Sequence, residues 1–535
     1  MSTLVDLTIG AWSLRVGRWS LTIGAWSLRI AREDPAGSSG RRWGLPRWSF
    51  RATQWLVGGL IALWALLLCW KGVSFAIRPR TFLILDEVGD LGWPLRVSYR
   101  SILHLFPTVI YCDRPLGFAF ERFLFEQFGF NYRPQLVCLL AVHFFVCILV
   151  FVLLRRLGIR LPLALAGTAA FGCLPCTPTA ATYLGGGAPD VLCTLFLLGS
   201  TLALLSERRW QWVLSAVLYL LALRSKEWGI VIPIFLTALV IVRQAPGSTV
   251  RRLLTEVGKR LWIHYLILLV FGACYLRLAA QIQTTFPAGT PYHVQPRLGT
   301  IYESLVYYTS LIVVGWNESP WRWVIFSALV LICLYALARR RGLILFGTLA
   351  YVVTLLPVSI IPNQRIPYYA YGPQIFLILV VCLFLEDMLD LLWKQPGRRW
   401  TVGACAAIVL LTGVSSVRTS PSYLNGIRWG WMLRETSWRT ARNAQAQLST
   451  IGPGSHVYVE SGQSIPWLFR PGPGTFLQVL RNDYSIETII EKPESEMQAL
   501  YDRDNAEKYL VDYAPDGSLT TRLAAPRREA AAPPK

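Results

Sequence analysis

The chain of 535 residues alternates between long apolar runs and short polar connectors. A helix needs about 20 apolar residues to cross the hydrocarbon core of a bilayer. On this basis the sequence predicts spans at 54–76, 134–154, 161–179, 189–206, 210–224, 228–243, 262–280, 320–338, 343–361, 372–393 and 400–417. We therefore expect an all-α polytopic membrane protein with about 11 transmembrane helices.

Basic residues in alternate connectors orient these spans. Arg and Lys cluster at 155–156, 208–209, 251–260, 339–341 and 394–399. Because such clusters gather on the cytoplasmic side of membrane proteins, we expect a cytoplasmic N-terminus and an extracytoplasmic C-terminus. The stretch 301–316 would break this alternation as a further span. We expect it to lie in the outer interface or to re-enter the membrane.

The N-terminal residues 1–53 carry an internal repeat. The sequence LTIGAWSLR occurs at 7–15 and again at 21–29. Its Leu, Ile, Trp and Arg residues are compatible with a short amphipathic helix at the membrane surface, but a dispensable cytoplasmic extension or a misassigned start is favoured. Residues 54–417 then form the predicted transmembrane domain.

Two long external loops and a C-terminal domain follow from this topology. The loops span 77–133 and 281–319, and the first ends in LGFAFERFLFEQFGF, whose aromatic spacing predicts a helix in the plane of the interface. Residues 418–535 are less hydrophobic and predict a small extracytoplasmic α+β domain with a disordered end. Its expected elements are a helix near 428–448 and strands at 456–460, 475–480 and 508–513.

Composition agrees with a membrane protein and excludes other classes. Hydrophobic residues make up 54% of the chain, charged residues only 16%, and the mean hydropathy is +0.43, which is not the balance of a soluble domain. The net charge of +21 lies mostly in the connectors, so we expect no nucleic-acid partner. Most of the 11 Cys lie inside apolar runs and none lies after Cys405, so no disulfide framework holds the C-terminal part.

An acidic pair, Asp86-Glu87, is unusual in a chain with only 31 acidic residues. It lies about ten residues beyond the first predicted span. A carboxylate there can take a proton from a hydroxyl, hold a metal ion or cap a helix. The same loop holds further arginines and Asp113, which either pairs with Arg114 or caps the helix expected at 115–128, or binds the substrate. This pattern predicts either a salt-bridged surface loop or a site in which Arg grips a phosphate and Asp activates a hydroxyl.

Further candidates lie at the outer ends of later spans. Lys226-Glu227 ends one span, where a charged pair either faces a functional cavity or snorkels to the interface. Asp190 follows three glycines at the start of another span, where an N-cap is favoured over a binding role. Arg365 and Tyr368 lie in the last short outer loop, where Arg can contact a phosphate and Tyr can belong to an aromatic belt.

The order of several stretches resembles a known enzyme superfamily. After Asp86-Glu87 come DRPLG at 113–117, FGCLPCTPTAATYLGGGAPDVL at 171–192, ALRSKEWGIVIPIFL at 222–236 and LLPVSIIPNQRIPYYAYGP at 355–373. Together they resemble the GT-C glycosyltransferases that use polyprenyl-phosphate sugars, above all the protein O-mannosyltransferases and the bacterial relatives of TPR-containing O-mannosyltransferases. The resemblance covers roughly residues 80–375.

This resemblance implies roles for the candidate residues. An acidic residue of the first loop acts as the base toward the acceptor, and Asp86, with Glu87 beside it, is the matching position. The candidate donor-binding residues are Asp113, Arg114, Asp190, Lys226, Glu227, Arg365 and Tyr368. No cofactor is required, and a divalent metal is compatible with the site.

The expected activity is transfer of a mannose-like sugar from a polyprenyl-phosphate donor to a hydroxyl at the external face, with inversion. The family's His-Pro-Pro-type element stands here as Arg-Pro-Leu, and the C-terminal region shows no TPR or β-trefoil pattern. The acceptor is therefore open between a protein, a lipid and a glycan. The alternatives are a transporter or flippase for polyprenyl-linked glycans and an inactive membrane scaffold. The Arg-rich composition favours a bacterial inner membrane.

Overall fold

The structure is a computed structural model that describes the larger part of the chain. Described are the backbone of four strands between residues 7 and 32, and residues 87, 91–109, 113–174, 176–206, 208–244, 248–278, 290, 292–312, 320–392, 435–461, 475–490, 506–513 and 519–525. The predicted spans 54–76 and 400–417, and Asp86, lie outside the described residues. The chain divides into two compact units, residues 1–69 and 70–535.

In the first unit the repeat forms strands, so the alternative of an interfacial helix is wrong. The strands β1 (Leu7–Thr8), β2 (Ala11–Val16), β3 (Trp19–Gly24) and β4 (Ser27–Arg32) pair antiparallel in chain order. In this register Leu14 faces Leu21 and Leu21 faces Ile30 across the ladder. The sequence explains the result, because WSLTIG and SLRIAR alternate apolar and polar residues with the period of 2 that strands require.

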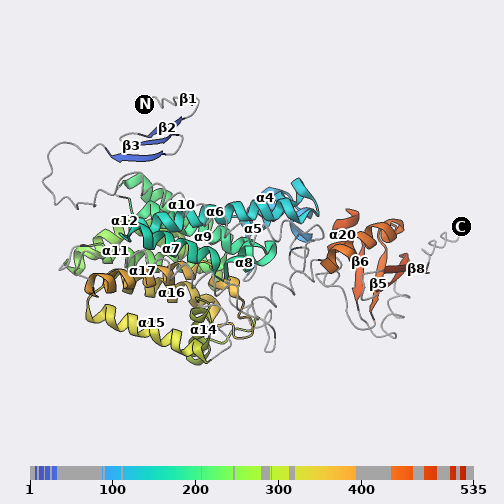
Figure 1. Ribbon diagram of the computed structural model, residues 1–535. Coiled ribbons are helices and arrows are strands. Elements are labelled where there is room, and N and C mark those ends of the chain that lie inside the picture. The colour runs from blue at the N-terminus through green and yellow to red at the C-terminus, as the bar shows by residue number, and fades with distance from the viewer. Residues whose placement is uncertain are drawn as a thin grey trace. The chain divides into compact units, whose positions relative to one another are not determined.

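The second unit is mainly helical (Figure 1). The segment before the first of the described apolar helices carries α3 (Gly92–Arg96), α4 (Tyr99–Ile102) and α5 (Pro115–Phe128). The apolar helices are α6 (Tyr132–Arg156), α7 (Leu161–Cys173), α8 (Cys176–Ala181), α9 (Leu184–Leu204), α10 (Arg209–Ser225), η1 (Glu227–Val231), α11 (Ile232–Val242), α12 (Val250–Leu278), α15 (Trp321–Ala338), α16 (Gly342–Ser359) and α17 (Pro373–Leu392). Each predicted span within the described residues coincides with one of these helices or with a broken pair of them.

Five of the described helices are long and apolar enough to cross a membrane: α6, α9, α12, α15 and α16. The segments Leu161–Gly172 and Glu227–Val242 are shorter apolar helices. A bilayer requires helices or closed barrels, because backbone groups inside it have no water to bind. These helices confirm a polytopic, mainly helical membrane protein.

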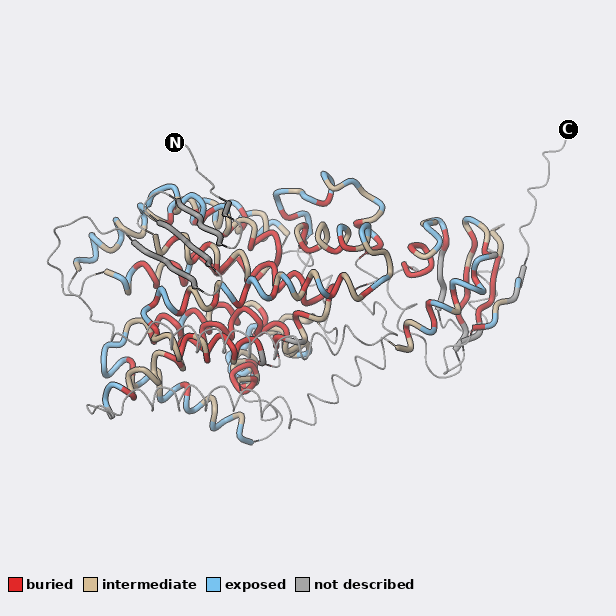
Figure 2. Tube along the Cα trace, turned by 45° about the horizontal axis from the view of Figure 1, so that its top comes forward, coloured by how far each residue is buried: buried red, intermediate tan, exposed pale blue. Residues whose placement is uncertain are grey.

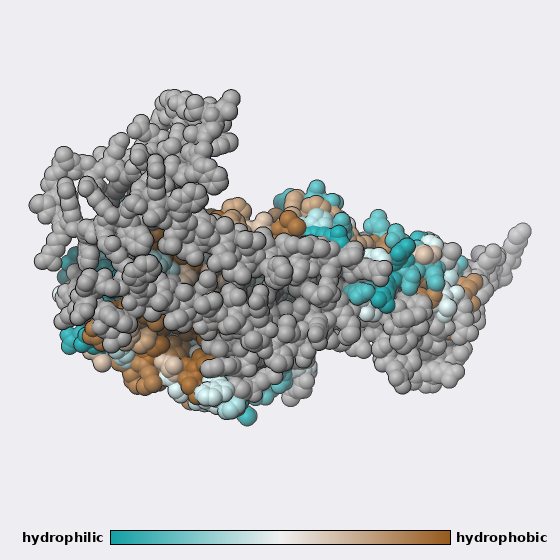
Figure 3. All heavy atoms as spheres, in the orientation of Figure 1, coloured by the Kyte–Doolittle hydropathy of each residue, from teal (hydrophilic) through white to brown (hydrophobic). Residues whose placement is uncertain are grey.

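Burial separates the centre of the bundle from its lipid-facing helices (Figure 2). In the most apolar window of α9, 78% of the residues are buried inside the protein, whereas the corresponding windows of α12 and α15 are 17% and 11% buried. Hydrophobic side chains such as Leu331 and Leu334 of α15 are exposed, and Figure 3 shows apolar atoms gathered at the lower left, where Figure 1 has α15. A helix that is apolar all round and little buried by protein is expected to face lipid.

Small residues let α9 approach its neighbours closely. A side chain at Gly187 would lie 2.2 Å from the carbonyl oxygen of Ala180 in α8. At Gly186 it would lie 2.8 Å from the hydroxyl of Tyr368, which belongs to η3 (Pro367–Ala370). The glycines therefore bring the start of α9 against both α8 and the last outer loop, as small residues do at helix contacts in membranes.

The stretch that would have broken the topology forms α14 (Leu298–Ser310). A helix of 13 residues is about 20 Å long, which is shorter than the hydrocarbon core of a bilayer. This length favours an interfacial or re-entrant helix over a further span.

The C-terminal region contains the expected α+β domain. A helix covers 435–447, and a sheet has the order β6 (Glu487–Ile490), β5 (His456–Ser461), β7 (Lys508–Tyr513) and β8 (Leu519–Ala525), with only β8 antiparallel. The strand predicted at 475–480 is wrong. That stretch is helix α20 (Thr475–Arg481), whose residues 475–479 are buried. A short apolar run cannot be assigned by periodicity alone, and here the alternation of TFLQVL is interrupted.

Candidate functional site

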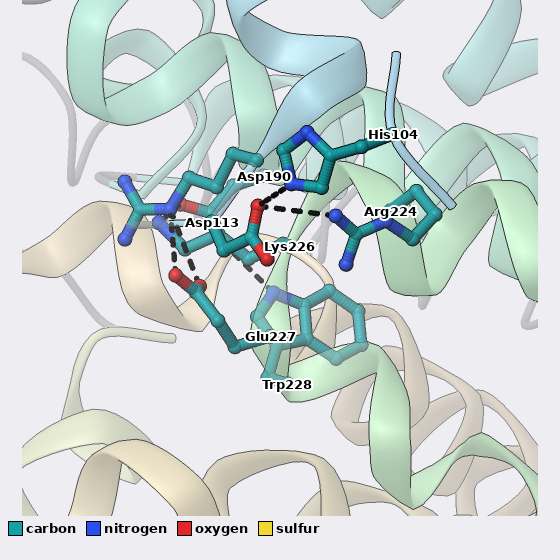
Figure 4. Close-up of polar contacts among 8 residues, drawn as sticks. His104, Asp113, Asp190, Arg224, Lys226, Glu227 and Trp228 are labelled. Atoms are coloured by element: carbon teal, nitrogen blue, oxygen red, sulfur yellow. Dashed lines mark hydrogen bonds and ion pairs between the residues drawn. The ribbon is translucent and has the colours of Figure 1, made fainter. Parts of the chain in front are cut away.

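Three separate segments bring charged side chains together at one end of the helical bundle (Figure 4). Residues 113–114 precede α5, Asp190 lies in the second turn of α9, and residues 224–228 follow the end of α10 into η1. Pro115 at the first turn of α5 ends the extended loop before it, and Lys226 at the C-cap of α10 has extended backbone angles. Because the chain is not helical at these points, the side chains of consecutive residues point in different directions.

Lys226 pairs with Asp190, and not with its sequence neighbour Glu227. Its Nζ lies 3.1 Å from Oδ2 of Asp190, and both side chains are buried. Trp228 donates from its indole Nε1 to Oδ1 of the same carboxylate at 2.9 Å. Asp190 therefore holds both sides of the turn between α10 and η1. The N-cap role expected for Asp190 is wrong, because the residue lies inside α9 and not at its start.

Glu227 instead binds Arg114 from the first external loop. The Nε of Arg114 donates to both carboxylate oxygens of Glu227, at 3.1 and 3.2 Å. The Arg114 side chain is 8% exposed and the Glu227 side chain 23% exposed, so this pair lies nearer to the solvent than the pair formed by Lys226. A charge-assisted contact of this kind fixes the start of α5 against the end of α10.

Asp113 is engaged by three partners. Its Oδ1 lies 2.7 Å from Nε2 of His104 and 3.1 Å from Nη2 of Arg224, and its Oδ2 accepts the backbone N–H of Thr108 at 2.9 Å. Of the two structural alternatives for Asp113, the structure gives neither: the neighbouring Arg114 binds Glu227 and is itself the N-cap residue of α5. Asp113 thus ties His104 and Thr108 to the last turn of α10.

The cluster holds three carboxylates and three cations, besides His104. Asp113, Asp190 and Glu227 face Arg224, Lys226 and Arg114, with His104 at the rim. Burying an ion is costly unless it is paired, so these pairs explain how the charges are tolerated near membrane depth. The Nε and Nη1 atoms of Arg224 are buried without a hydrogen-bond acceptor among the described residues. They are donors that an anion could use.

Two tyrosines of the loop between α16 and α17 lie beside Lys226. Its Nζ is 5.8 Å from the ring centre of Tyr368 and 5.4 Å from that of Tyr369. Burial raises the pKa of both phenols, so they are neutral at physiological pH. Arg365 of the same loop binds Glu303 of α14 at 2.9 Å. The loop therefore covers Lys226 with neutral aromatic rings, while Arg365 points to a different partner.

Glu87 contacts the start of α9. Its Oε1 accepts the backbone N–H of Leu184, the first residue of the helix, at 2.9 Å, and the residue is 2% exposed. Orphan N–H groups at a helix start favour a carboxylate. The acidic pair is thus anchored to α9 through Glu87.

A metal site was a sequence-based alternative for these carboxylates. Within the described ranges, which do not include Asp86, no three His, Cys, Asp or Glu side chains lie close enough together to hold a metal ion. Carboxylates that share a hard cation converge on one point. Here Asp113, Asp190 and Glu227 each face a cation of their own.

Sequence reasoning missed His104, Arg224 and Trp228. Arg224 and Trp228 flank the predicted Lys226-Glu227 pair, and Arg224 lies inside the span expected at 210–224. An Arg within an apolar span is a functional candidate by itself, so that signal was present. His104 offered no such signal, because its partner Asp113 becomes a neighbour only when loop 104–113 folds over α10.

Comparison with known proteins shows similarity of fold. No family model and no curated protein matches the chain. The Archaeoglobus fulgidus oligosaccharyltransferase in the apo form has a TM-score of 0.53 and 11% identity, with 87% of this chain and 70% of that chain covered. ArnT from Cupriavidus metallidurans, in the apo state and bound to undecaprenyl phosphate, gives a TM-score of 0.49 and 14% identity in each case, with 87% of this chain and 94% of that chain covered.

At such identities a structural match carries the fold and leaves the chemistry to be argued from the site. The match to the oligosaccharyltransferase spans most of both chains. It agrees with the multi-pass helical architecture described above and with the order of motifs in the sequence. The chain therefore shares the fold of this oligosaccharyltransferase.

Proposed function

We propose that this protein is a membrane glycosyltransferase that moves a sugar from a polyprenyl-phosphate donor to an acceptor hydroxyl at the external face of the membrane. The sugar is mannose-like, and the acceptor is a protein, a lipid or a glycan. The N-terminus lies in the cytoplasm, and the membrane is the inner membrane of a bacterium. The fold shared with an oligosaccharyltransferase supports this class of reaction.

One observation carries the proposal: the buried cluster of alternating charges at the end of α10, in a helical membrane bundle of this fold. Paired charges at membrane depth mark functional sites by default. A cluster built only for stability could be replaced by apolar side chains at little cost. A phosphate ligand, in contrast, requires cations, and the cluster retains three of them.

The cations and the tyrosines have separate roles toward the donor. Lys226 and Arg224 neutralise the phosphate as it gains charge, since Arg224 keeps two buried donors without an acceptor among the described residues. Tyr368 and Tyr369 shield Lys226 from water. Preorganised donors in a dry site stabilise developing charge far better than water does. Asp190 and Asp113 orient the two cations.

Asp86 acts as the base. The acceptor oxygen forms a bond to the anomeric carbon while the bond from that carbon to the phosphate oxygen breaks, and the electron pair of that bond leaves with the phosphate. The hydroxyl proton passes to the Asp86 carboxylate. Direct displacement inverts the anomeric centre. Glu87 positions Asp86 by its contact with the start of α9, and the chemistry requires no cofactor.

The test is transfer of labelled sugar from polyprenyl-phosphate mannose and related donors by the purified full-length protein. Asp86→Asn should abolish transfer, and Lys226→Met should lower it by about 100-fold or more, the usual loss on removal of one charge-stabilising donor. Arg339→Gln, which removes an exposed cation at the C-cap of α15, should retain activity. Full activity of Lys226→Met would exclude the assigned phosphate role. Absence of transfer by the wild type with every donor would overturn the proposal and favour a transporter or a scaffold.

A further inference from the structure

The first turns of α12 project beyond the neighbouring helix α10. His264 of α12 lies beside Ser215 of α10, at 3.0 Å between Nε2 and Oγ, and Lys259 and Arg260 lie over the ring of Trp212. At both contacts the residue number in α12 exceeds that in α10 by nearly the same amount. The two helices therefore run in the same direction. Residues 250–257 of α12 therefore extend past Arg209, where α10 begins, by about 10 Å.

The projecting turns of α12 lie beyond the apolar part of the bundle. The 29 residues of α12 correspond to about 43 Å, whereas the hydrocarbon core of a bilayer is about 30 Å thick. Its C-terminal part carries the apolar window, and its N-terminal part carries the charges. The start of α12 therefore lies at the level of the lipid headgroups.

Six cations gather at this level and form what we call the basic ledge. Its members are Arg208, Arg209, Arg251, Arg252, Lys259 and Arg260. The only acidic partner among the described residues is Glu256, which binds Arg260 at 3.1 Å and Lys259 at 3.6 Å. Arg251 and Arg252 are exposed. The ledge therefore keeps a large excess of positive charge.

Two other basic connectors of the bundle each contain an Arg that is paired within the chain. Arg160 binds Asp390 and Arg341 binds Asp387, each at 2.7 Å, at the acidic end of α17. Among the described residues, no ion pair joins the basic ledge to these carboxylates. This lack of pairing distinguishes the ledge from the other connectors, whose excess of Arg and Lys orients the protein in the membrane.

Apolar side chains are interleaved with these cations. Leu254 is 66%, Trp262 60% and Trp210 57% exposed, and Trp212 holds Lys259 and Arg260 over its ring at 5.6 and 5.2 Å. Exposed Trp beside Arg and Lys is the pattern of a surface that contacts both acyl chains and headgroups. A soluble anion would meet only the charges.

We propose that the basic ledge is a binding site for the headgroup of an anionic phospholipid, with the phosphate held by the ledge cations and the acyl chains lying along Leu254 and Trp262. Lys259 and Arg260 are preorganised by Trp212, while Arg251 and Arg252 close over the headgroup from the projecting turn. This site is independent of the proposed sugar transfer and lies at the opposite end of α10 from the charged cluster.

The experiment uses full-length protein in nanodiscs of phosphatidylcholine into which phosphatidylglycerol is titrated. The readouts are the phosphatidylglycerol molecules retained in native mass spectrometry and the midpoint of thermal unfolding. The wild type should retain phosphatidylglycerol and unfold at a higher temperature as its fraction rises. Removing two cations in Arg251→Gln/Arg252→Gln should weaken binding by roughly 10- to 30-fold, since each basic residue near an anionic surface contributes about 1 kcal/mol.

The matched control is Arg339→Gln/Arg340→Gln, which removes the same charge from two exposed arginines at another connector. It should retain phosphatidylglycerol like the wild type, and Lys259→Gln/Arg260→Gln should lose it. If the control loses phosphatidylglycerol to the same extent as the ledge variants, the net charge alone attracts the lipid, and the proposed site is overturned. Equal retention by the wild type and both ledge variants would overturn it as well. Glycerol phosphate, which lacks acyl chains, should shift no midpoint. A shift as large as that of the lipid would assign the ledge to free phosphate instead.

Discussion

Lys226 and Asp190 form a buried ion pair between two helices, with Nζ 3.1 Å from Oδ2 and side chains that are 4% and 1% exposed. The pair spans 36 positions of sequence, while the carboxylate next to Lys226 in the chain binds Arg114 instead. Asp190 also accepts the indole N–H of Trp228. One carboxylate inside α9 therefore sets the geometry of the turn that carries the cationic residues.

Removing one member of this pair should destabilise the protein more than removing both. Asp190→Asn leaves the Lys226 charge buried without a counterion, and we expect a loss of about 3 kcal/mol in the free energy of unfolding. Asp190→Asn/Lys226→Met should regain most of it. Unfolding in detergent measures this, and additive losses would show that the two side chains do not interact. Both variants should lose transfer activity, because each lacks the oriented cation.

Asp113 should matter far more than its partner His104. Asp113→Ala leaves Arg224 buried without its carboxylate, for which we expect a loss of about 3 kcal/mol or more. His104→Ala removes one hydrogen bond from a side chain that is 23% exposed, for which we expect about 1 kcal/mol. Thermal unfolding of the two variants side by side is the measurement. Equal losses would show that loop 104–113, and not Arg224, depends on Asp113.

Amide substitution should distinguish the roles of the two carboxylates, Asp86 and Glu87. Glu87→Gln keeps an oxygen that accepts the Leu184 N–H, so most transfer activity should remain, whereas Glu87→Leu leaves the start of α9 without its acceptor and should cost about 1–2 kcal/mol of stability. Asp86→Asn should remove activity and leave stability unchanged. Initial rates and unfolding midpoints of the three variants test this. Loss of activity in Glu87→Gln with normal stability would transfer the base role to Glu87.

Acid should release a contact in the first external loop. Glu126 accepts from Arg122 at 2.6 Å and from the Tyr99 hydroxyl at 2.7 Å. The hydrogen bond from Arg122 is the main cause that lowers the pKa of Glu126. A carboxyl with a depressed folded pKa stabilises the fold above its unfolded pKa of about 4.3 and loses this contribution as the pH falls through the folded pKa.

The unfolding midpoints of the wild type and of Glu126→Gln should therefore differ at pH 6 and converge as the pH drops below about 4. The magnitude is small because the pair is partly exposed and screened by solvent. Arg439→Gln, which breaks an exposed i,i+4 pair with Glu435 in the C-terminal region, serves as the control for general acid effects. A difference for Glu126→Gln that persists unchanged at pH 3 would contradict the assignment.

The sequence alone determined the membrane class, the helices and the general place of the site. Long apolar runs must become helices in a bilayer because no other element satisfies its own backbone there, so the spans within the described residues follow from composition. The same local logic failed for the repeat at 7–29 and for 475–480. Both are short, and their structure depends on what pairs with them or covers them.

The tertiary structure decided the partners of the charged residues. Sequence adjacency suggested Asp113 with Arg114 and Lys226 with Glu227, but the structure pairs Asp113 with Arg224 and Lys226 with Asp190. The physical reason is that consecutive residues at a helix end point in different directions, so a buried charge finds its partner on whichever segment packs against it. His104 and Trp228 enter the cluster in the same way. The sequence supplied the charges at membrane depth, and only the packing of α5, α9 and α10 decided which charges meet.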